Sequence, residues 1–75
     1  MARAVAELCR EYGLTQREGE VAACLARGYT LPQTAEHLNV SVDTVRSRSK
    51  RLYRKLDIHK KQQLIELIEE SKAHS

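Results

Sequence analysis

Three helix-start signals divide the middle of this sequence into short helical segments. Thr15 is followed by Glu18 and Thr30 by Gln33, and each pair fits a capping box, in which two side chains bind free backbone N–H groups at a helix start. Ser41 is a natural N-cap for a third helix. Because the sequence lacks the period-two alternation that a half-buried strand needs, we predict an all-α fold.

Apolar residues at helical spacing and a few turn residues set the expected segments. Gly13 and Gly28 are natural helix stops, and Pro32 suits a first helical turn. The predicted helices cover about residues 2–12, 15–28, 30–38, 42–56 and 60–71. We expect an N-terminal helix or linker tail in residues 1–13, one domain in residues 14–71 and a frayed C-terminus in residues 72–75.

A chain of 75 residues without Trp or Phe has a thin core, which Leu, Val, Ile and Ala must fill. Packed helices suit these small side chains, with an expected stability on the order of a few kcal/mol. Cys9 and Cys24 are isolated, and we expect them as small buried hydrophobes without a disulfide. His37, His59 and His74 have no metal-ligand spacing with either cysteine, so we expect no metal and no cofactor.

Several classes of protein do not fit the sequence. No apolar run approaches the ~20 residues of a membrane span, and residues 1–10 do not resemble a signal peptide. We therefore expect a cytoplasmic module without membrane contact. The sequence has no nucleophile–base cluster, no Gly-rich phosphate loop and no metal set, so we do not expect an enzyme.

Positive charge is concentrated in one part of the chain. The formal net charge is +3, but eight of the 13 Lys and Arg residues fall within residues 43–61, where only Asp43 and Asp57 oppose them. These eight are Arg46, Arg48, Lys50, Arg51, Arg54, Lys55, Lys60 and Lys61. A cationic segment on a near-neutral body is typical of proteins that bind phosphate groups.

The predicted helix over residues 42–56 has an apolar side and a cationic side. A single stripe on the side expected in the core recurs at i, i+4, i+7 and i+11 and consists of Val45, Ser49, Leu52 and Leu56. The opposite side carries Arg46, Ser47, Lys50, Arg51 and Arg54, with Arg48 and Lys55 on one flank and Tyr53 on the other. One side of this helix is therefore expected in the core and the other on a partner.

The preceding helix and turn complete a helix-turn-helix unit. It consists of a short capped helix, a tight turn whose apolar Val40 is expected to plug the core, and the longer basic helix. In such a unit the second helix lies in the DNA major groove, with its N-terminal residues at the base edges. A basic face alone is more often a solvated surface, but combined with this unit it predicts double-stranded DNA as the partner.

Side-chain length and position assign roles within the unit. Arg46 and Lys50 lie one turn apart and are long enough to reach guanine acceptors, and the short Ser47 can approach a base edge closely. We predict that these three residues read bases. Hydroxyl and amide groups at helix starts, and cations on the flanks, suit phosphates. The predicted backbone contacts are Thr30, Gln33, Ser41, Thr44, Arg48, Arg51, Arg54 and Lys55.

Residues 14–68 resemble the LuxR-type helix-turn-helix domain of bacterial transcription regulators. Their sequence is LTQREGEVAACLARGYTLPQTAEHLNVSVDTVRSRSKRLYRKLDIHKKQQLIELI. The motifs that carry the resemblance are Leu14-Thr15 with Glu18 and Val21, the helix end at residues 26–28, Ala35 with Leu38, Ser41 with Thr44-Val45-Arg46, and Lys55-Leu56. Arg48 stands where the family usually has His, and Gly19 replaces a usual long polar residue. The resemblance implies a four-helix domain, here with an additional N-terminal helix, that binds DNA sequence-specifically.

The resemblance also implies roles for individual positions. The positions matching Arg46, Ser47 and Lys50 typically approach bases. Those matching Thr30, Thr44, Arg48 and Arg54 tend towards backbone contacts. The last helix often mediates dimerisation in this family, and we expect Ile65, Gln62 and Glu69 at a homodimer interface.

Two alternatives stay open at this point. Residues 45–48, Val-Arg-Ser-Arg, also resemble the −35-reading region of extracytoplasmic-type sigma factors, although the extra helix after Leu56 favours the LuxR type. The basic helix could instead dock an acidic protein partner, with Ile65 and the Glu-rich end at Glu66, Glu69 and Glu70 contributing. RNA polymerase is therefore a second candidate partner.

Overall fold

The computed structural model describes residues 3–74, with side chains described for residues 3–70. Within this range the chain is all-α, as predicted, and has no strand. The helices are α1 (Arg3–Tyr12), α2 (Gln16–Ala26), α3 (Leu31–Leu38), α4 (Val42–Leu56) and α5 (Lys61–His74). The expected start at Ala2 lies outside the described residues, as does Ser75. The helical backbone of α5 continues through residues 72–74.

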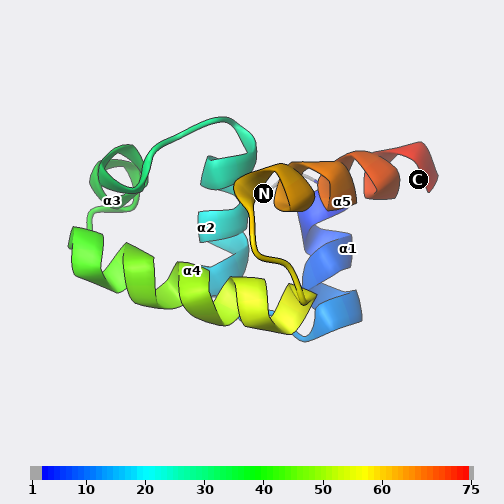
Figure 1. The fold of residues 1–75 in the computed structure, drawn as a ribbon, viewed down its shortest axis with the longest axis horizontal. Helices are drawn as coiled ribbons and strands as arrows, with labels where there is room; N and C mark the ends of the chain where they lie inside the picture. Colours follow the sequence, from blue (N-terminus) through cyan, green and yellow to red (C-terminus); the bar gives the residue numbers. More distant parts are fainter. Residues whose placement is uncertain (1–2, 75) are drawn as a thin grey trace.

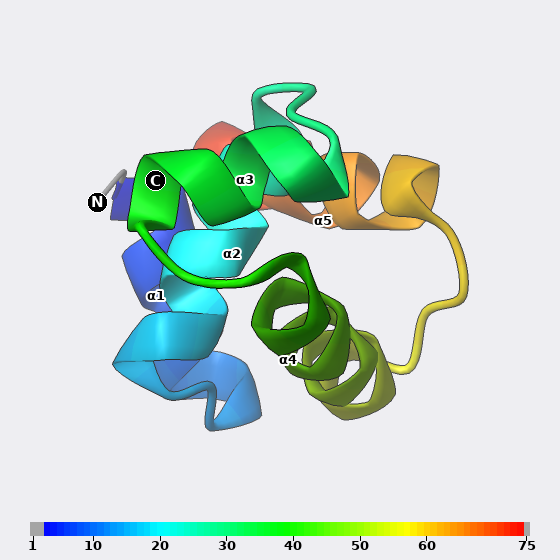
Figure 2. The same cartoon turned by 90° about the vertical axis from the view of Figure 1, so that its left-hand side faces the viewer.

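The helices pack as crossed layers (Figure 1). α1 and α2 run antiparallel side by side, and α4 crosses α2 near the N-terminal half of α2. α5 contacts both α1 and α2 and lies on the upper side of the view, away from α4. Figure 2 shows α4 nearly end-on beside α2, with α3 crossing above it. α2 is therefore the central element, since it contacts each of the other four helices.

The core consists of aliphatic side chains from several helices. Val21 of α2, Val45 and Leu52 of α4 and Leu64 of α5 are completely buried, and Val5 of α1 is almost so. Each buried side chain of this size stabilises the fold by about 1.5–3 kcal/mol relative to an exposed one. The stripe predicted for α4 thus forms the contact that holds this helix on the domain.

Both predicted capping boxes form. At α2, Glu18 Oε1 accepts from Thr15 N at 2.8 Å, and Thr15 Oγ1 accepts from Glu18 N at 3.1 Å. At α3, Gln33 Oε1 accepts from Thr30 N at 2.9 Å, and Thr30 Oγ1 accepts from Gln33 N at 3.2 Å. Ser41 caps α4, as predicted, because its Oγ accepts from the Thr44 backbone N at 3.2 Å. These starts are therefore set by side chains within a few residues of each helix.

Helices α1 to α4 end in the same kind of turn. One residue adopts the left-handed conformation, and the backbone N–H of the next residue reaches back into the last helical turn. The left-handed residues are Gly13, Gly28, Asn39 and Asp57, with φ of 67°, 91°, 58° and 55°. The hydrogen bonds that these N–H groups donate are Leu14 N to Cys9 O, Tyr29 N to Cys24 O, Val40 N to Ala35 O and Ile58 N to Tyr53 O, at 2.9–3.2 Å. The two glycine stops were predicted, whereas the left-handed Asn39 and Asp57 were not.

Candidate nucleic-acid interface

Helices α3 and α4 form the predicted two-helix unit. They pack against each other and are joined by residues 39–41 alone. Val40, in the middle of this connection, is partly buried against the core, as expected for an apolar plug. The left-handed Asn39 turns the chain sharply at the end of α3, and Ser41 immediately starts α4. The sequence of this connection therefore ends α3 and starts α4 within three residues.

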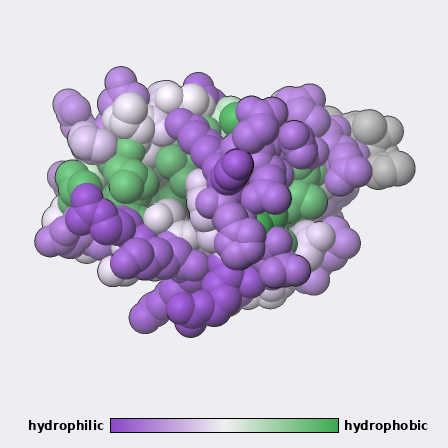
Figure 3. Space-filling view, viewed as in Figure 1, coloured by the Kyte–Doolittle hydropathy of each residue, from purple (hydrophilic) through white to green (hydrophobic). Residues whose placement is uncertain are grey.

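The two sides of α4 differ sharply in exposure. Val45, Leu52 and Leu56 are buried in the core, and Ser49 is partly buried. The opposite side is exposed and carries Arg46, Ser47, Lys50, Arg51 and Arg54. Figure 3 shows hydrophilic side chains along the lower edge of the molecule, over α4. The helix is about 22 Å long at 1.5 Å per residue, which is enough to follow a major groove past several base pairs.

The three predicted base-reading residues lie together on this exposed side. Arg46, Ser47 and Lys50 all belong to the first two and a half turns of α4. Arg46 is not isolated, because its Nη1 donates to Asp43 Oδ1 at 3.0 Å. Asp43 was not among the predicted site residues. Its spacing from Ser47 and Lys50, four and seven residues, was the signal that could have placed it in the same exposed row.

The predicted backbone contacts at the helix starts keep hydrogen-bond donors available. In the α3 capping box, Thr30 and Gln33 use their side-chain oxygens as acceptors, which leaves the Thr30 hydroxyl hydrogen and the Gln33 amide NH₂ to donate. Both residues are exposed. At α4, the Ser41 and Thr44 hydroxyls lie 2.9 Å apart and share one hydrogen bond. Either start can therefore donate to a phosphate oxygen without losing its cap.

The flanking arginines differ in exposure but share an absence of local partners. Arg51 and Arg54 are exposed, and Arg48 is partly buried. Within the described side chains, none of the three forms an ion pair with an acidic residue. Among the described side chains, their charges are therefore not neutralised.

Lys55 occupies a different environment from the other predicted phosphate contacts. Its Nζ donates to Glu18 Oε1 at 2.7 Å and to the Gly13 carbonyl oxygen at 3.1 Å. Burial alone would raise the pKa of Glu18, but hydrogen bonds from Lys55 and from the Thr15 backbone, together with the Lys55 charge, hold that pKa below its usual range. The Lys55 charge is thus already used inside the domain, so a structural role fits it better than a phosphate contact.

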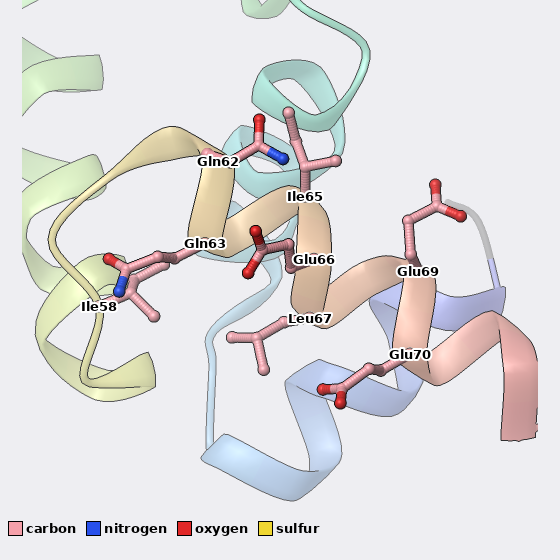
Figure 4. Close-up of a pocket in the computed structure, with 8 residues that line it drawn as sticks. All are labelled: Ile58, Gln62, Gln63, Ile65, Glu66, Leu67, Glu69 and Glu70. Atoms are coloured by element: carbon pink, nitrogen blue, oxygen red, sulfur yellow. The ribbon is translucent and has the colours of Figure 1, made fainter.

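The three predicted dimer residues share one side of α5. Figure 4 shows Gln62, Ile65 and Glu69 along the upper side of the helix in that view, and Glu70 on the lower side. Gln62 and Glu69 are exposed and Ile65 is partly buried. The three belong to a shallow groove lined by Ile58, Gln62, Gln63, Ile65, Glu66, Leu67, Glu69 and Glu70. The prediction thus corresponds to one continuous surface.

The described residues do not form a metal site, because no group of three or more His, Cys, Asp or Glu among them could hold a metal ion. Cys9 and Cys24 are both free thiols, partly buried and buried, and burial raises the pKa of each. In the same part of the chain, no helix is long and apolar enough to cross a membrane. The α3–α4 unit is therefore the candidate site that the geometry supports.

Comparison with known proteins identifies the family. The pattern of the family described as "Bacterial regulatory proteins, luxR family" matches residues 12–68, which include all of α2, α3 and α4. The chain belongs to the luxR family. This luxR-family match also supports the LuxR-type interpretation over the sigma-factor alternative. The luxR-family helix-turn-helix domain is typically a DNA-binding part of transcription regulators and is not catalytic.

Individual relatives agree with the family match. The chain is 36% identical over 62 residues to the HTH-type transcriptional regulator MalT of Yersinia pestis (strain Pestoides F) and of Yersinia pseudotuberculosis serotype O:1b (strain IP 31758). It is also 36% identical over 62 residues to MalT of Klebsiella pneumoniae subsp. pneumoniae. These matches cover 83% of this luxR-family chain but only 7% of each relative. No solved structure matches the chain.

Proposed function

We propose that this luxR-family domain binds double-stranded DNA sequence-specifically, as the output domain of a bacterial transcription regulator in the cytoplasm. The observation that carries the proposal is the two-sided character of α4. One side is buried and holds the helix firmly on the domain, and the other exposes four arginines and lysines around Ser47. A rigidly held cationic helix that follows a capped short helix suits the major groove.

The proposal assigns base reading to the N-terminal half of α4. Arg46 and Lys50 reach guanine O6 and N7, and Ser47 approaches a neighbouring base edge. Phosphates flank this row and are held by Arg48, Arg51 and Arg54, which form no ion pair among the described side chains, and by the donors at the starts of α3 and α4. Lys55 is left out of the contact set, because its ammonium group is bound to Glu18.

The proposal further includes a homodimer formed through α5. Its support is the shared surface of Gln62, Ile65 and Glu69, with a partly buried isoleucine between two polar residues. A two-fold dimer would present two copies of α4 to half-sites about 34 Å apart, which is one helical turn of DNA. A contact with RNA polymerase stays a prediction from the sequence.

The test is a selection of bound sequences from a random duplex pool, followed by a salt titration on the enriched duplex. We expect an enriched motif and a steep fall in affinity with salt, since bound phosphates release counterions. Arg46→Ala and Lys50→Ala should each lose about 1–3 kcal/mol of discrimination at one base position. Arg54→Ala should weaken all duplexes similarly and flatten the salt slope by about one unit.

The outcomes separate clearly. Failure of the domain to bind any duplex at low salt would contradict DNA binding itself. Binding without an enriched motif would leave only backbone contacts and contradict sequence-specific recognition by the domain. An unchanged motif in both the Arg46→Ala and Lys50→Ala variants would show that the base-reading residues are elsewhere.

A further inference from the structure

Asp43 is the acidic residue of α4, and it lies in the first turn, at the N-terminal end of the exposed row of side chains. Counting along the helix, Ser47, Lys50 and Arg54 follow it at i+4, i+7 and i+11, the same spacing that puts Val45 and Leu56 in the core on the other side. Asp43 is highly exposed, at 92% of its side-chain surface. A carboxylate therefore lies on the side of α4 that is proposed to face DNA.

A carboxylate at this place opposes simple attraction to phosphates. Every other charged side chain of α4 is cationic, and the DNA backbone is uniformly anionic. A role in stabilising the helix start, through the helix dipole, would need a negative charge in the first turn but would not need contact with Arg46. The structure contains this contact, in which Arg46 Nη1 donates to Asp43 Oδ1 at 3.0 Å.

The ion pair restricts one of the predicted base-reading side chains. Arg46 is about half exposed, at 53%, and only one of its nitrogens is bound to Asp43. An arginine has five N–H donors in a fixed planar fork, so a second edge of the guanidinium remains for guanine O6 and N7. A long side chain held at one corner loses less freedom when it binds a base than a free one does.

We propose that Asp43 is the positioning residue that makes Arg46 selective for guanine. The inference rests on the proposed function. It holds that the carboxylate fixes the Arg46 guanidinium towards a base edge and, by its charge, disfavours registers in which the Asp43 side chain itself lies against a phosphate. Asp43 would thereby lower affinity for arbitrary DNA while raising discrimination at one base position.

The test measures Kd for the selected duplex, for the same duplex with each base substituted at every position, and for an unrelated duplex. Arg46→Ala first defines the position that Arg46 reads. Asp43→Ala should then lose about tenfold discrimination at that same position, which is part of what a bidentate arginine–guanine contact supplies. The same variant should bind the unrelated duplex about two- to fivefold more tightly, as expected from removing one exposed like charge.

Three further variants separate positioning from fold and from general charge. Asp43→Glu should restore most of the discrimination, because Glu and Arg three residues apart on a helix can still pair. Glu36→Ala removes an exposed negative charge from α3 and should leave discrimination unchanged. In the double variant Asp43→Ala with Arg46→Ala, the loss should not exceed that of Arg46→Ala alone, since the two residues act as one unit.

The results that overturn the inference differ from those that overturn the proposed function. If the domain enriches a motif but Asp43→Ala keeps full discrimination, Asp43 does not position Arg46. If Asp43→Ala loses discrimination at another position, additively with Arg46→Ala, Asp43 reads a base of its own and the positioning role is wrong. If the wild-type domain enriches no motif, sequence-specific binding itself has failed.

Discussion

The Lys55 ammonium lies 2.7 Å from Glu18 Oε1 and 3.1 Å from the Gly13 carbonyl oxygen, so one side chain joins the end of α4 to the start of α2 and the turn before it. Glu18 is almost fully buried, with 5% of its side chain exposed, whereas Lys55 is 37% exposed. A buried carboxylate without a partner is strongly unfavourable. The pair therefore helps to fix the position of α4 against α2.

Removing the cation should destabilise the domain more than removing a neighbouring one. We expect Lys55→Met to lower the free energy of unfolding by about 2 kcal/mol, a value reduced from that of fully buried pairs because Lys55 is partly solvated. The matched control is Arg54→Met, on the exposed side of the same helix, with an expected change within about 0.5 kcal/mol. Urea unfolding followed by circular dichroism measures both, and equal values for the two variants would contradict the structural role of Lys55.

The lowered pKa of Glu18 predicts a pH dependence of stability. Because the folded pKa lies below the ordinary value of 4.5, the ionised form is favoured in the folded state, and this contribution is complete above pH 4.5. It is lost as the pH falls through the lower folded pKa. Glu18→Gln keeps an acceptor for the cap but cannot titrate, so the stability difference between wild type and variant should shrink from about pH 6 to about pH 3. A constant difference in unfolding experiments over that range would contradict the assignment.

At the scale of elements, the two capping boxes differ in one side-chain atom, a carboxylate oxygen in one and an amide nitrogen in the other, and this difference bears on the proposed DNA contact. α2 uses a glutamate at the third helical position and α3 uses a glutamine. The α2 carboxylate is turned inward to Lys55, whereas Gln33 is exposed at the start of α3, the helix that precedes α4. A neutral amide caps α3 without repelling a phosphate and can donate to one.

This difference predicts a variant that separates folding from binding. Gln33→Glu should keep the capping box and the stability of α3, since glutamate serves equally well in that motif. It should weaken binding to all duplexes by about 1 kcal/mol, or roughly fivefold in Kd, because a charge is placed close to a phosphate. The control is Gln63→Glu, whose side-chain oxygen accepts from the His59 and Lys60 backbone at the start of α5. Fluorescence anisotropy measures the affinity of both variants. Equal losses would show that the change in net charge, and not the position of Gln33 near a phosphate, weakens binding.

The sequence predicted the helix starts better than the helix ends. Thr15 with Glu18, Thr30 with Gln33, and Ser41 are local signals, and all three starts form as predicted. The left-handed Asn39 and Asp57 were missed, because a polar residue in that conformation has a weaker signature than glycine.

Long-range contacts explain what the sequence could not predict about the site. Spacing along α4 placed Lys55 on a cationic flank, but its partner Glu18 lies 37 residues away and only the tertiary packing brings them together. Asp43 was visible as an acidic residue, yet its pairing with Arg46 depends on side-chain rotamers that periodicity does not specify. The exposed row itself followed from helical spacing alone.

At the scale of the whole molecule, the proposed dimer surface lies on α5, away from α4 (Figure 1). Ile65→Lys should abolish the concentration-dependent increase in mass that a dimer shows in sedimentation, because it places a charge in the centre of the apolar contact. Glu36→Lys adds at least as much positive charge on exposed α3, outside the groove that holds the predicted dimer residues, and should leave the increase in place. A strictly monomeric wild-type chain at high concentration and on DNA would contradict the dimer.

The turns that end α1 to α4 bear on how quickly the chain folds. Each of them is closed by a backbone bond that spans five residues, such as Val40 N to Ala35 O, so these turns are local contacts along the chain. Helical domains with mostly local contacts fold in microseconds to milliseconds. We expect the domain to refold within that time after a transient unfolding, so that the proposed DNA binding would be interrupted only briefly.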